Sequence, residues 1–163
     1  MSDAVAPVAA PILLQFSMNN TLIAKGLEGL SDDDLWHQME GRGNPIAWVV
    51  GHVTETRAQM LRALGASASL GWGGRFKRGS ARVDRAEYPD RVDIAGQFLA
   101  SRELVVSALQ SLTPDRLTEP APVSVGGAKT VADLVAFFAF HETYHVGQIG
   151  FIRKNLGHSA LVG

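Results

Sequence analysis

Residues 130–155 constrain the fold more than any other part of the chain, because their pattern predicts one long helix. Thr130 is suited to be its N-cap, and Asp133 stands where it completes a capping box. Gly157 is expected to end the helix, since glycine readily adopts the left-handed backbone that follows a helix C-terminus. A helix of this length crosses a whole domain, so the other elements are predicted to pack along it.

One face of this predicted helix is apolar apart from a few polar side chains. The stripe comprises Leu134, Phe137, Phe138, His141, His145, Gln148, Ile149 and Ile152. Side chains four residues apart lie on the same face of a helix, one turn from each other, so the imidazoles of His141 and His145 can reach a single metal ion. With five histidines in the chain, chance supplies such a pair roughly one time in eight, so the spacing alone is a weak signal.

The position of the two histidines on a buried stripe strengthens the prediction of a metal site. A buried polar side chain without a hydrogen bond costs about 1 to 3 kcal/mol. A metal ion shared by His141 and His145 would satisfy both imidazoles. The alternative is a pair of core histidines that hydrogen-bond to backbone carbonyls or to water.

A third histidine interrupts the inward face of an earlier helix. Asn44 as N-cap and Pro45 at the first helical position predict a helix that runs to about Leu64. Its inward stripe is Trp48, Val49, His52, Thr56, Met60 and Ala63. His52 lies about 12 Å inside the start of this helix, and His145 lies about 15 Å inside the end of the last one. If the two helices are antiparallel, the three histidines meet.

Two further helices and a loop complete the predicted elements. The first helix begins near Pro11 and ends within residues 26–30, and residues 31–36 form a helical turn capped by Ser31. His37 is expected to be exposed. A third helix, residues 90–112, contains no histidine and is interpreted as structural, with an inward face of Val92, Ile94, Phe98, Leu104, Val105, Ala108 and Leu109. Residues 113–129 are predicted to be a loop in which residues 123–125 pair briefly as an extended segment.

Residues 65–88 are too rich in glycine for regular structure and predict a long crossover. A connection of this length lets the second and third helices run parallel, which leaves the second and fourth antiparallel. The crossover region is also basic, with Arg75, Lys77, Arg78, Arg82 and Arg85. These residues could bind an anionic group of a substrate, or they could form a solvated face, which is the usual role of such a run.

Composition excludes several classes of function. A chain of 163 residues with 46% hydrophobic and 19% charged residues is expected to form one domain, residues 1–163, with a sizeable core. A net charge of -1 gives no general attraction to nucleic acid or to an anionic membrane. The sequence has no cysteine, which excludes disulfides, thiolate ligands and a cysteine nucleophile. Because residues 1–7 lack the basic start of a signal peptide and no apolar run suggests a membrane span, we expect a cytoplasmic protein.

These residues resemble the DinB/YfiT-like superfamily of metal-binding four-helix bundles. The similarity covers nearly the entire chain, and its most specific part is the run from His141 to Gln148, of the form His-x-x-x-His-x-Gly-Gln. Asn44, Pro45 and His52 give it moderate support. The resemblance implies an all-α, up-down-down-up bundle with a long crossover between its second and third helices.

The resemblance also implies a site. His52, His141 and His145 would bind one divalent metal ion, with nickel or zinc preferred and iron or manganese as further possibilities. Members are often homodimers, and characterised relatives include thiol-dependent transferases, which suggests a low-molecular-weight thiol as cosubstrate. Three imidazoles leave coordination positions open to water or substrate, which is typical of a catalytic site.

Glu142 lies between the paired histidines in a pattern that zinc proteases share, where a glutamate acts as general base. The extended metzincin form of that pattern needs glycine and histidine where this chain has Gln148 and Phe151. Glu142 points about 100° away from His141 on a helix, so it is either a partner of the site or a surface charge. His158 is a conceivable distant ligand, but beyond Gly157 we expect it to be mobile.

Two classes of function follow from the sequence and the resemblance. The first is a metal-dependent enzyme that acts on a small molecule, either a thiol-dependent transferase or a hydrolase. The second is a non-catalytic metal-binding or ligand-binding bundle with a role in stress response. No nucleic-acid-binding motif is present, so nucleic acid is not an expected partner.

Overall fold

Four long helices form most of the structure, a computed structural model that describes residues 9–41, 43–80 and 83–162. The long helices are α1 (Ala9–Leu27), α3 (Ile46–Ala63), α4 (Arg91–Gln110) and α6 (Val131–Asn155). The connections hold the short helices α2 (Asp32–Trp36) and α5 (Pro114–Thr118) and the 3-10 turns η1 (Met39–Gly41) and η2 (Arg85–Glu87). These described ranges contain no β-strand, so the predicted all-α fold is confirmed. None of their helices is both long and apolar enough to cross a membrane.

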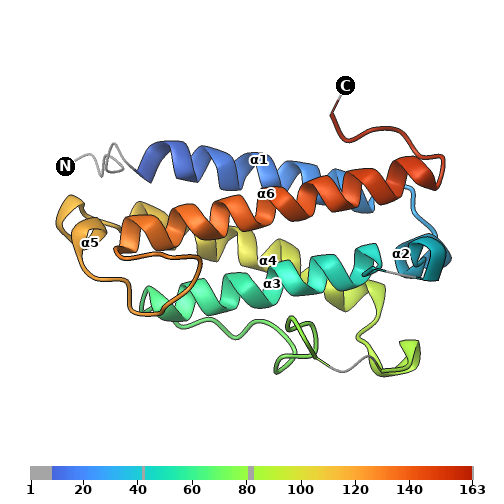
Figure 1. Cartoon of the computed structure of the whole chain (residues 1–163), viewed down its shortest axis with the longest axis horizontal. Helices are drawn as coiled ribbons and strands as arrows, with labels where there is room; N and C mark the ends of the chain where they lie inside the picture. The colour runs from blue at the N-terminus through green and yellow to red at the C-terminus, as the bar shows by residue number, and fades with distance from the viewer. Residues whose placement is uncertain (1–8, 42, 81–82, 163) are drawn as a thin grey trace.

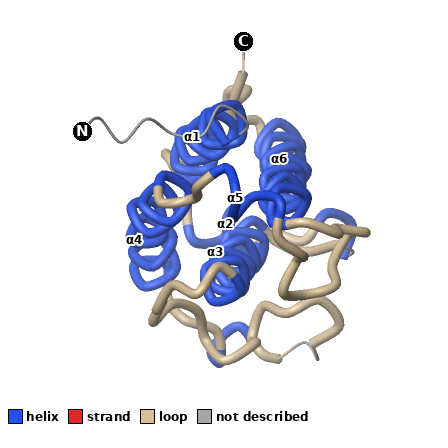
Figure 2. The backbone as a smooth tube through the Cα atoms, turned by 90° about the vertical axis from the view of Figure 1, so that its left-hand side faces the viewer, coloured by secondary structure: helices blue, strands red, loops and turns tan. Residues whose placement is uncertain are grey.

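The long helices are arranged as an up-down-down-up bundle. α1 and α6 run in one direction along the long axis, while α3 and α4 run in the other (Figure 1). The order around the bundle is α1, α6, α3 and α4, so α6 lies between α1 and α3 (Figure 2). The crossover, residues 64–90, returns the chain along the bundle and lets α3 and α4 run parallel, as predicted. α3 and α6 are therefore antiparallel neighbours.

The ends of α6 follow the predicted signals. Thr130 Oγ1 accepts a hydrogen bond from Asp133 N, and the Asp133 carboxylate accepts one from Thr130 N, which completes the capping box. Leu156 is the C-cap, and Gly157 follows it with a φ of 85°, a left-handed conformation that suits glycine. Both ends of the helix that carries the histidine pair are thus specified locally.

The start of α3 differs from the prediction by one residue. Pro45 is the N-cap instead of Asn44, and no side chain caps the helix. Pro45 has a ψ of 162°, so its backbone is still extended and the helix begins at Ile46. The cap predicted at Asn44 is therefore wrong. His52 nevertheless lies well inside α3, as expected.

The connection between α4 and α6 also differs from the prediction. Thr113 caps the short helix α5 within the segment that was expected to be loop only. The backbone pairs at the base of this connection, between Pro120 and Thr130, and not at residues 123–125. Gly126 and Gly127 both have positive φ and turn the chain directly after these residues, which keeps them out of an extended pairing.

A polar layer divides the bundle core into two apolar clusters. One cluster includes Ile23, Val53, Phe98 and Val146, and the other includes Phe16, Met60, Val105 and Ala139. Between these positions each long helix carries a buried polar side chain; the four are Asn20, Arg57, Ser101 and Glu142. The same layer lies next to the histidine-bearing turns of α3 and α6.

α4 buries a narrower face than predicted. Ile94, Phe98, Val105 and Leu109 are buried as expected, whereas Val92 is 78% exposed and Leu104 is 37% exposed. Among the long helices, α4 packs mainly against α3 and α1, so its other side faces solvent. The inward position of Val92 and Leu104 was therefore predicted wrongly.

The crossover covers the outer face of α3. The Phe76 ring lies against Gly51, where a Cβ atom would stand 2.6 Å from the ring and could not be accommodated. Phe76 is fully buried, and α3 is consequently buried almost all round over its first half. This contact brings the crossover backbone to the level of His52.

Candidate metal centre

The structure brings together the three histidines that were predicted to share a metal ion. His52 comes from α3, and His141 and His145 come from successive turns of α6. The Nε2 atom of His141 lies 3.2 Å from Nε2 of His52 and 3.1 Å from Nε2 of His145. One ligand atom from each residue lies within 4.8 Å of the others, which makes the cluster a candidate metal site.

Hydrogen bonds on the far side of two rings fix their tautomers. His52 Nδ1 lies 2.7 Å from the carbonyl oxygen of Phe76, and His145 Nδ1 lies 2.6 Å from Oε1 of Gln148. Both oxygens only accept, so each Nδ1 carries the proton and donates it. In the neutral imidazoles of His52 and His145, Nε2 therefore presents a lone pair toward the centre of the cluster.

This arrangement of lone pairs fits a cation. Nε2 of His141 carries at most one proton, so it can donate to either His52 or His145 but not to both. The buried Nδ1 of His141 has no hydrogen-bond partner. A shared cation would accept all three Nε2 lone pairs, and the separations of 3.1 and 3.2 Å suit nitrogens that each lie about 2.0 to 2.1 Å from one ion.

Burial keeps these imidazoles neutral, which is the form that binds metal. Burial, together with the neighbouring His145 and His52, lowers the pKa of His141 to about 4. Burial likewise lowers the pKa of His145 to about 4, against the opposing effect of its hydrogen bond to Gln148. The pKa of His52 is also lowered by burial, although its bond to Phe76 opposes the shift.

Aromatic rings enclose the cluster and account for this desolvation. Trp48 stacks on His52 with ring centroids 5.0 Å apart. The Tyr144 ring meets the edge of His145 at 5.3 Å, and Phe137 lies 6.0 Å from His141. The centre thus has an apolar surround, in which the attraction between a cation and the imidazole lone pairs is stronger than in water.

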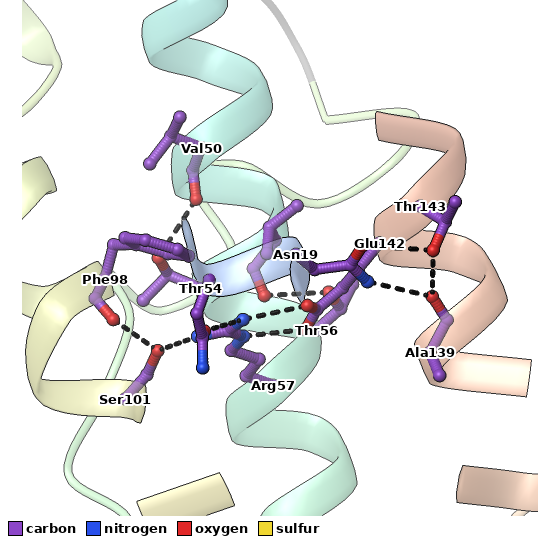
Figure 3. Close-up of polar contacts among 12 residues, drawn as sticks. Asn19, Val50, Thr54, Thr56, Arg57, Phe98, Ser101, Ala139, Glu142 and Thr143 are labelled. Atoms are coloured by element: carbon purple, nitrogen blue, oxygen red, sulfur yellow. Dashed lines mark hydrogen bonds and ion pairs between the residues drawn. The ribbon is translucent and has the colours of Figure 1, made fainter. Parts of the chain in front are cut away.

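Glu142 lies outside the cluster and is paired with a buried arginine. Nε and Nη2 of Arg57 donate to its two carboxylate oxygens at 2.6 and 2.8 Å. Figure 3 shows Arg57 between Glu142 and Ser101, to which it donates at 2.8 Å. Arg57 also donates to Asn20 at 2.7 Å, so one side chain of α3 binds residues of the three other long helices. A carboxylate held in this way is not free to act as a general base beside the histidines. The zinc-protease interpretation is therefore wrong.

Sequence reasoning missed Arg57, Asn20 and Ser101. A usable signal was present, because Arg57 follows Val53 by four residues and precedes Met60 by three, which places it on an apolar face. A charge on such a face needs a buried partner. Glu142 was the matching acid on the last helix.

A glutamate on α3 anchors the crossover that positions His52. Glu55 Oε1 accepts hydrogen bonds from the backbone N–H of Trp72 at 3.0 Å and Gly74 at 2.9 Å, and its Oε2 accepts one from Phe76 N at 3.1 Å. The peptide segment held by these bonds contains the Phe76 carbonyl that accepts from His52. A cavity of about 710 Å³ lies between this segment and α3, with His52 in its wall.

The remaining polar residues from the sequence prediction lie in different places. Lys77 and Arg78 line the cavity, whereas Arg75 lies 4.0 Å from Glu87 and Arg85 pairs with the acidic residues Asp32 and Asp33 of α2. Arg82 lies outside the described residues.

The two other histidines do not join the cluster. His37 is exposed, as expected. His158 is half-buried, and its Nε2 lies 3.3 Å from the Asp34 carboxylate. This contact with α2 places His158 away from the candidate site.

Comparison with known protein families agrees with this architecture. The family model of the DinB superfamily matches residues 15–149. The matched range contains His52, His141 and His145 together with the whole crossover. A search of curated proteins found no match. Because the matched range covers well over half of the sequence, the chain belongs to the DinB superfamily.

Proposed function

We propose that this protein is a divalent-metal-dependent enzyme that acts on a small molecule, with His52, His141 and His145 as the metal ligands. The observation that carries the proposal is the convergence of three Nε2 atoms in which the Nδ1 hydrogen bonds of His52 and His145 direct two lone pairs at one point. Hydrogen bonds within the cluster cannot satisfy that arrangement, whereas a cation can.

The donor set supports catalysis over a purely structural role. Structural zinc sites have four protein ligands, while catalytic sites have three and leave a position for water or substrate. Imidazole ligands suit zinc, nickel and iron, in line with the nickel or zinc that the family resemblance implies. When bound, such an ion supplies Lewis acidity, which can activate a thiol cosubstrate or a water molecule. We therefore propose either a thiol-dependent transferase or a hydrolase.

The residues around the cluster have defined roles in this proposal. Phe76 O and Gln148 Oε1 orient the imidazoles of His52 and His145. Trp48 and Phe137 exclude water from the rings. The cavity beside His52 is large enough for a small-molecule substrate, since ligand sites typically measure about 300 to 1,000 Å³.

Elemental analysis of the purified protein, followed by activity assays, tests the proposal. We expect about one divalent ion per chain, lost on chelation and restored by zinc or nickel. Alanine variants of His52, His141 and His145 should each lose most of the metal, while the exposed His37→Ala control retains it. Unchanged metal content in all three variants would refute the ligand assignment.

Turnover separates the two classes of function. The metal-loaded protein should convert an electrophile in the presence of a small thiol, or hydrolyse an activated ester, and the chelated protein should not. Metal binding without turnover in either assay would favour the alternative, a non-catalytic metal-binding bundle with a role in stress response.

A further inference from the structure

The cavity beside His52 is built from two segments that are distant in sequence. Its wall includes Thr56, Gln59 and Arg62 from α3 and Trp72, Lys77 and Arg78 from the crossover. His52 belongs to the same wall. A molecule in this cavity therefore lies against the edge of the three-histidine cluster.

Three cationic side chains line the cavity without acidic partners. Within residues 9–41, 43–80 and 83–162, no carboxylate forms an ion pair with Arg62, Lys77 or Arg78. By contrast, Arg75 and Arg85, which come from the same crossover, do pair with carboxylates. Among the described basic residues of the crossover, Arg75 and Arg85 are thus paired with carboxylates, whereas the exposed Lys77 and Arg78 are unpaired at the mouth of the cavity.

The acidic residue in the cavity wall does not neutralise these cations. Glu55 uses its carboxylate to accept three backbone N–H groups, from Trp72, Gly74 and Phe76. Backbone donors that converge on a carboxylate satisfy its lone pairs and offset part of its charge. The wall therefore keeps a positive potential on the side of Arg62, Lys77 and Arg78.

The cavity is also preformed. The crossover is bound to α4 as well as to α3, because Gly71 N donates to Gln97 at 2.7 Å and Trp72 Nε1 donates to Asp93 at 2.5 Å. A segment fixed at both sides does not need to be ordered when a ligand binds, which lowers the entropic cost of binding.

We propose that this cavity binds the anionic group of the substrate, a carboxylate or a phosphate, through Arg62, Lys77 and Arg78. The planar guanidinium groups of Arg62 and Arg78 can each donate two parallel N–H bonds to a pair of oxygens of a carboxylate or a phosphate, and Lys77 adds a point charge. The inference rests on the proposed function, because it places the reacting part of the same substrate at the metal centre. It narrows the substrate to a small acid.

Anion titration of the metal-loaded and the metal-free protein tests this inference. The probes are inorganic phosphate and succinate, and calorimetry measures their dissociation constants in both forms. The variants are Arg62→Gln, Lys77→Gln, Arg78→Gln and the triple replacement. Lys154→Gln is the matched control, since it removes one exposed charge from the end of α6 and does not line the cavity.

Each single replacement should raise the dissociation constant about three- to tenfold, the triple replacement should raise it further, and the control should leave it unchanged. The probe that binds more tightly identifies the anion as phosphate or carboxylate. Equal anion affinity in the wild type and the triple variant would overturn the inference, and so would binding that requires the metal but none of the cations. If the triple variant does not fold, the dissociation constant of the Arg78→Gln variant, whose substitution lies on the exposed crossover, tests the inference instead.

Metal content measured in each sample separates this inference from the proposed function. If the proposed metal site is wrong, the wild-type protein will contain no bound ion. The titration of the metal-free protein still tests the cations in that case. Binding of the probes through Arg62, Lys77 and Arg78 in a protein that contains no metal would support the anion site and contradict the proposed metal-dependent enzyme.

Discussion

The amide of Gln148 and the carbonyl of Phe76 hold two imidazoles in the same tautomer by different means. The Phe76 oxygen belongs to the backbone, so no side-chain substitution removes it directly. Gln148 acts through its side chain and is additionally oriented by Tyr144, whose hydroxyl accepts a hydrogen bond from its Nε2 at 3.3 Å. The orientation of His145 can therefore be tested by a single substitution.

Gln148→Leu should weaken zinc binding about 10- to 100-fold, because partners that orient a metal-bound histidine typically contribute that much to affinity. Competition with a chromogenic chelator measures the dissociation constant. Gln148→Glu keeps an acceptor at Nδ1 and should restore most of the affinity. Equal affinities for the leucine variant and the wild type would show that Gln148 does not position His145.

The lowered pKa values of His141 and His145 make the metal-free protein sensitive to acid. In the unfolded chain these imidazoles take up protons near pH 6.5, whereas in the folded protein their pKa is about 4. Between these values the unfolded state binds more protons, so the free energy of unfolding should fall as the pH decreases from about 6.5 toward 4. Urea titrations of the chelated protein measure this slope. The free energy of unfolding of the His141→Phe variant should depend less steeply on pH. Identical slopes for the variant and the wild type would show that His141 does not contribute to the acid sensitivity.

At the scale of helices, Arg57 and Glu142 join α3 to α6 at the centre of the core. Both side chains are almost fully buried. Removing one partner from a buried ion pair leaves an uncompensated charge, whereas replacing both by apolar side chains is often nearly neutral. Asn20 and Ser101 extend the same contact to α1 and α4. The layer thus sets the level at which all four long helices meet.

Arg57→Leu should lower the free energy of unfolding by about 3 to 5 kcal/mol, and Arg57→Leu combined with Glu142→Leu should recover most of that loss. Urea unfolding of the wild type, both single variants and the double variant completes the cycle. A double variant as unstable as Arg57→Leu would show that the arginine acts mainly through Asn20, Ser101 and its contact with the Phe98 ring.

Helix positions and the pairing of His141 with His145 were predictable because they rest on local patterns, whereas the place of His52 beside them followed from the expected helix directions and the family resemblance. The capping box at Thr130, the apolar periodicity of α6 and the spacing of His141 and His145 all lie within a few turns of one another. The hydrogen bonds between Arg57 and Glu142 join residues 85 positions apart, and the bond between His52 and Phe76 depends on the path of a glycine-rich crossover. Such contacts follow from packing, which no local pattern specifies.

For the whole molecule, the apolar core should make the fold independent of the metal. Both core clusters include residues from all four long helices. Chelation should therefore leave the helical circular dichroism signal in place at pH 8, in contrast to small zinc domains that unfold without metal. On acidification toward pH 4, where His141 and His145 take up protons in the folded protein, metal content should fall before helicity does. Loss of both together would make the ion a structural element.

We also propose that the protein forms a homodimer. Leu14 and Met18 on α1 and Phe140, Tyr144 and Phe151 on α6 are more than half exposed, and these two helices are neighbours. Exposed apolar surface of this kind is typical of an interface. Light scattering at tens of micromolar should give twice the chain mass for the wild type and a lower mass for Phe151→Glu. Val92→Glu, at an exposed position of α4, is the control, and a monomeric wild type would refute the proposal.

The packing of the first helix against the last has a consequence for biosynthesis. α1 lies beside α6, and two of the three clustered histidines are on α6, so neither the bundle nor the metal centre can close until α6 has left the ribosome. Contacts between such distant segments slow folding, because the loop between them must close first. Until then, the parts of α1 and α3 that pack against α6 stay uncovered, and exposed apolar surface of this kind makes nascent chains aggregate or recruit chaperones. A metal ion can therefore secure this bundle only after it has assembled.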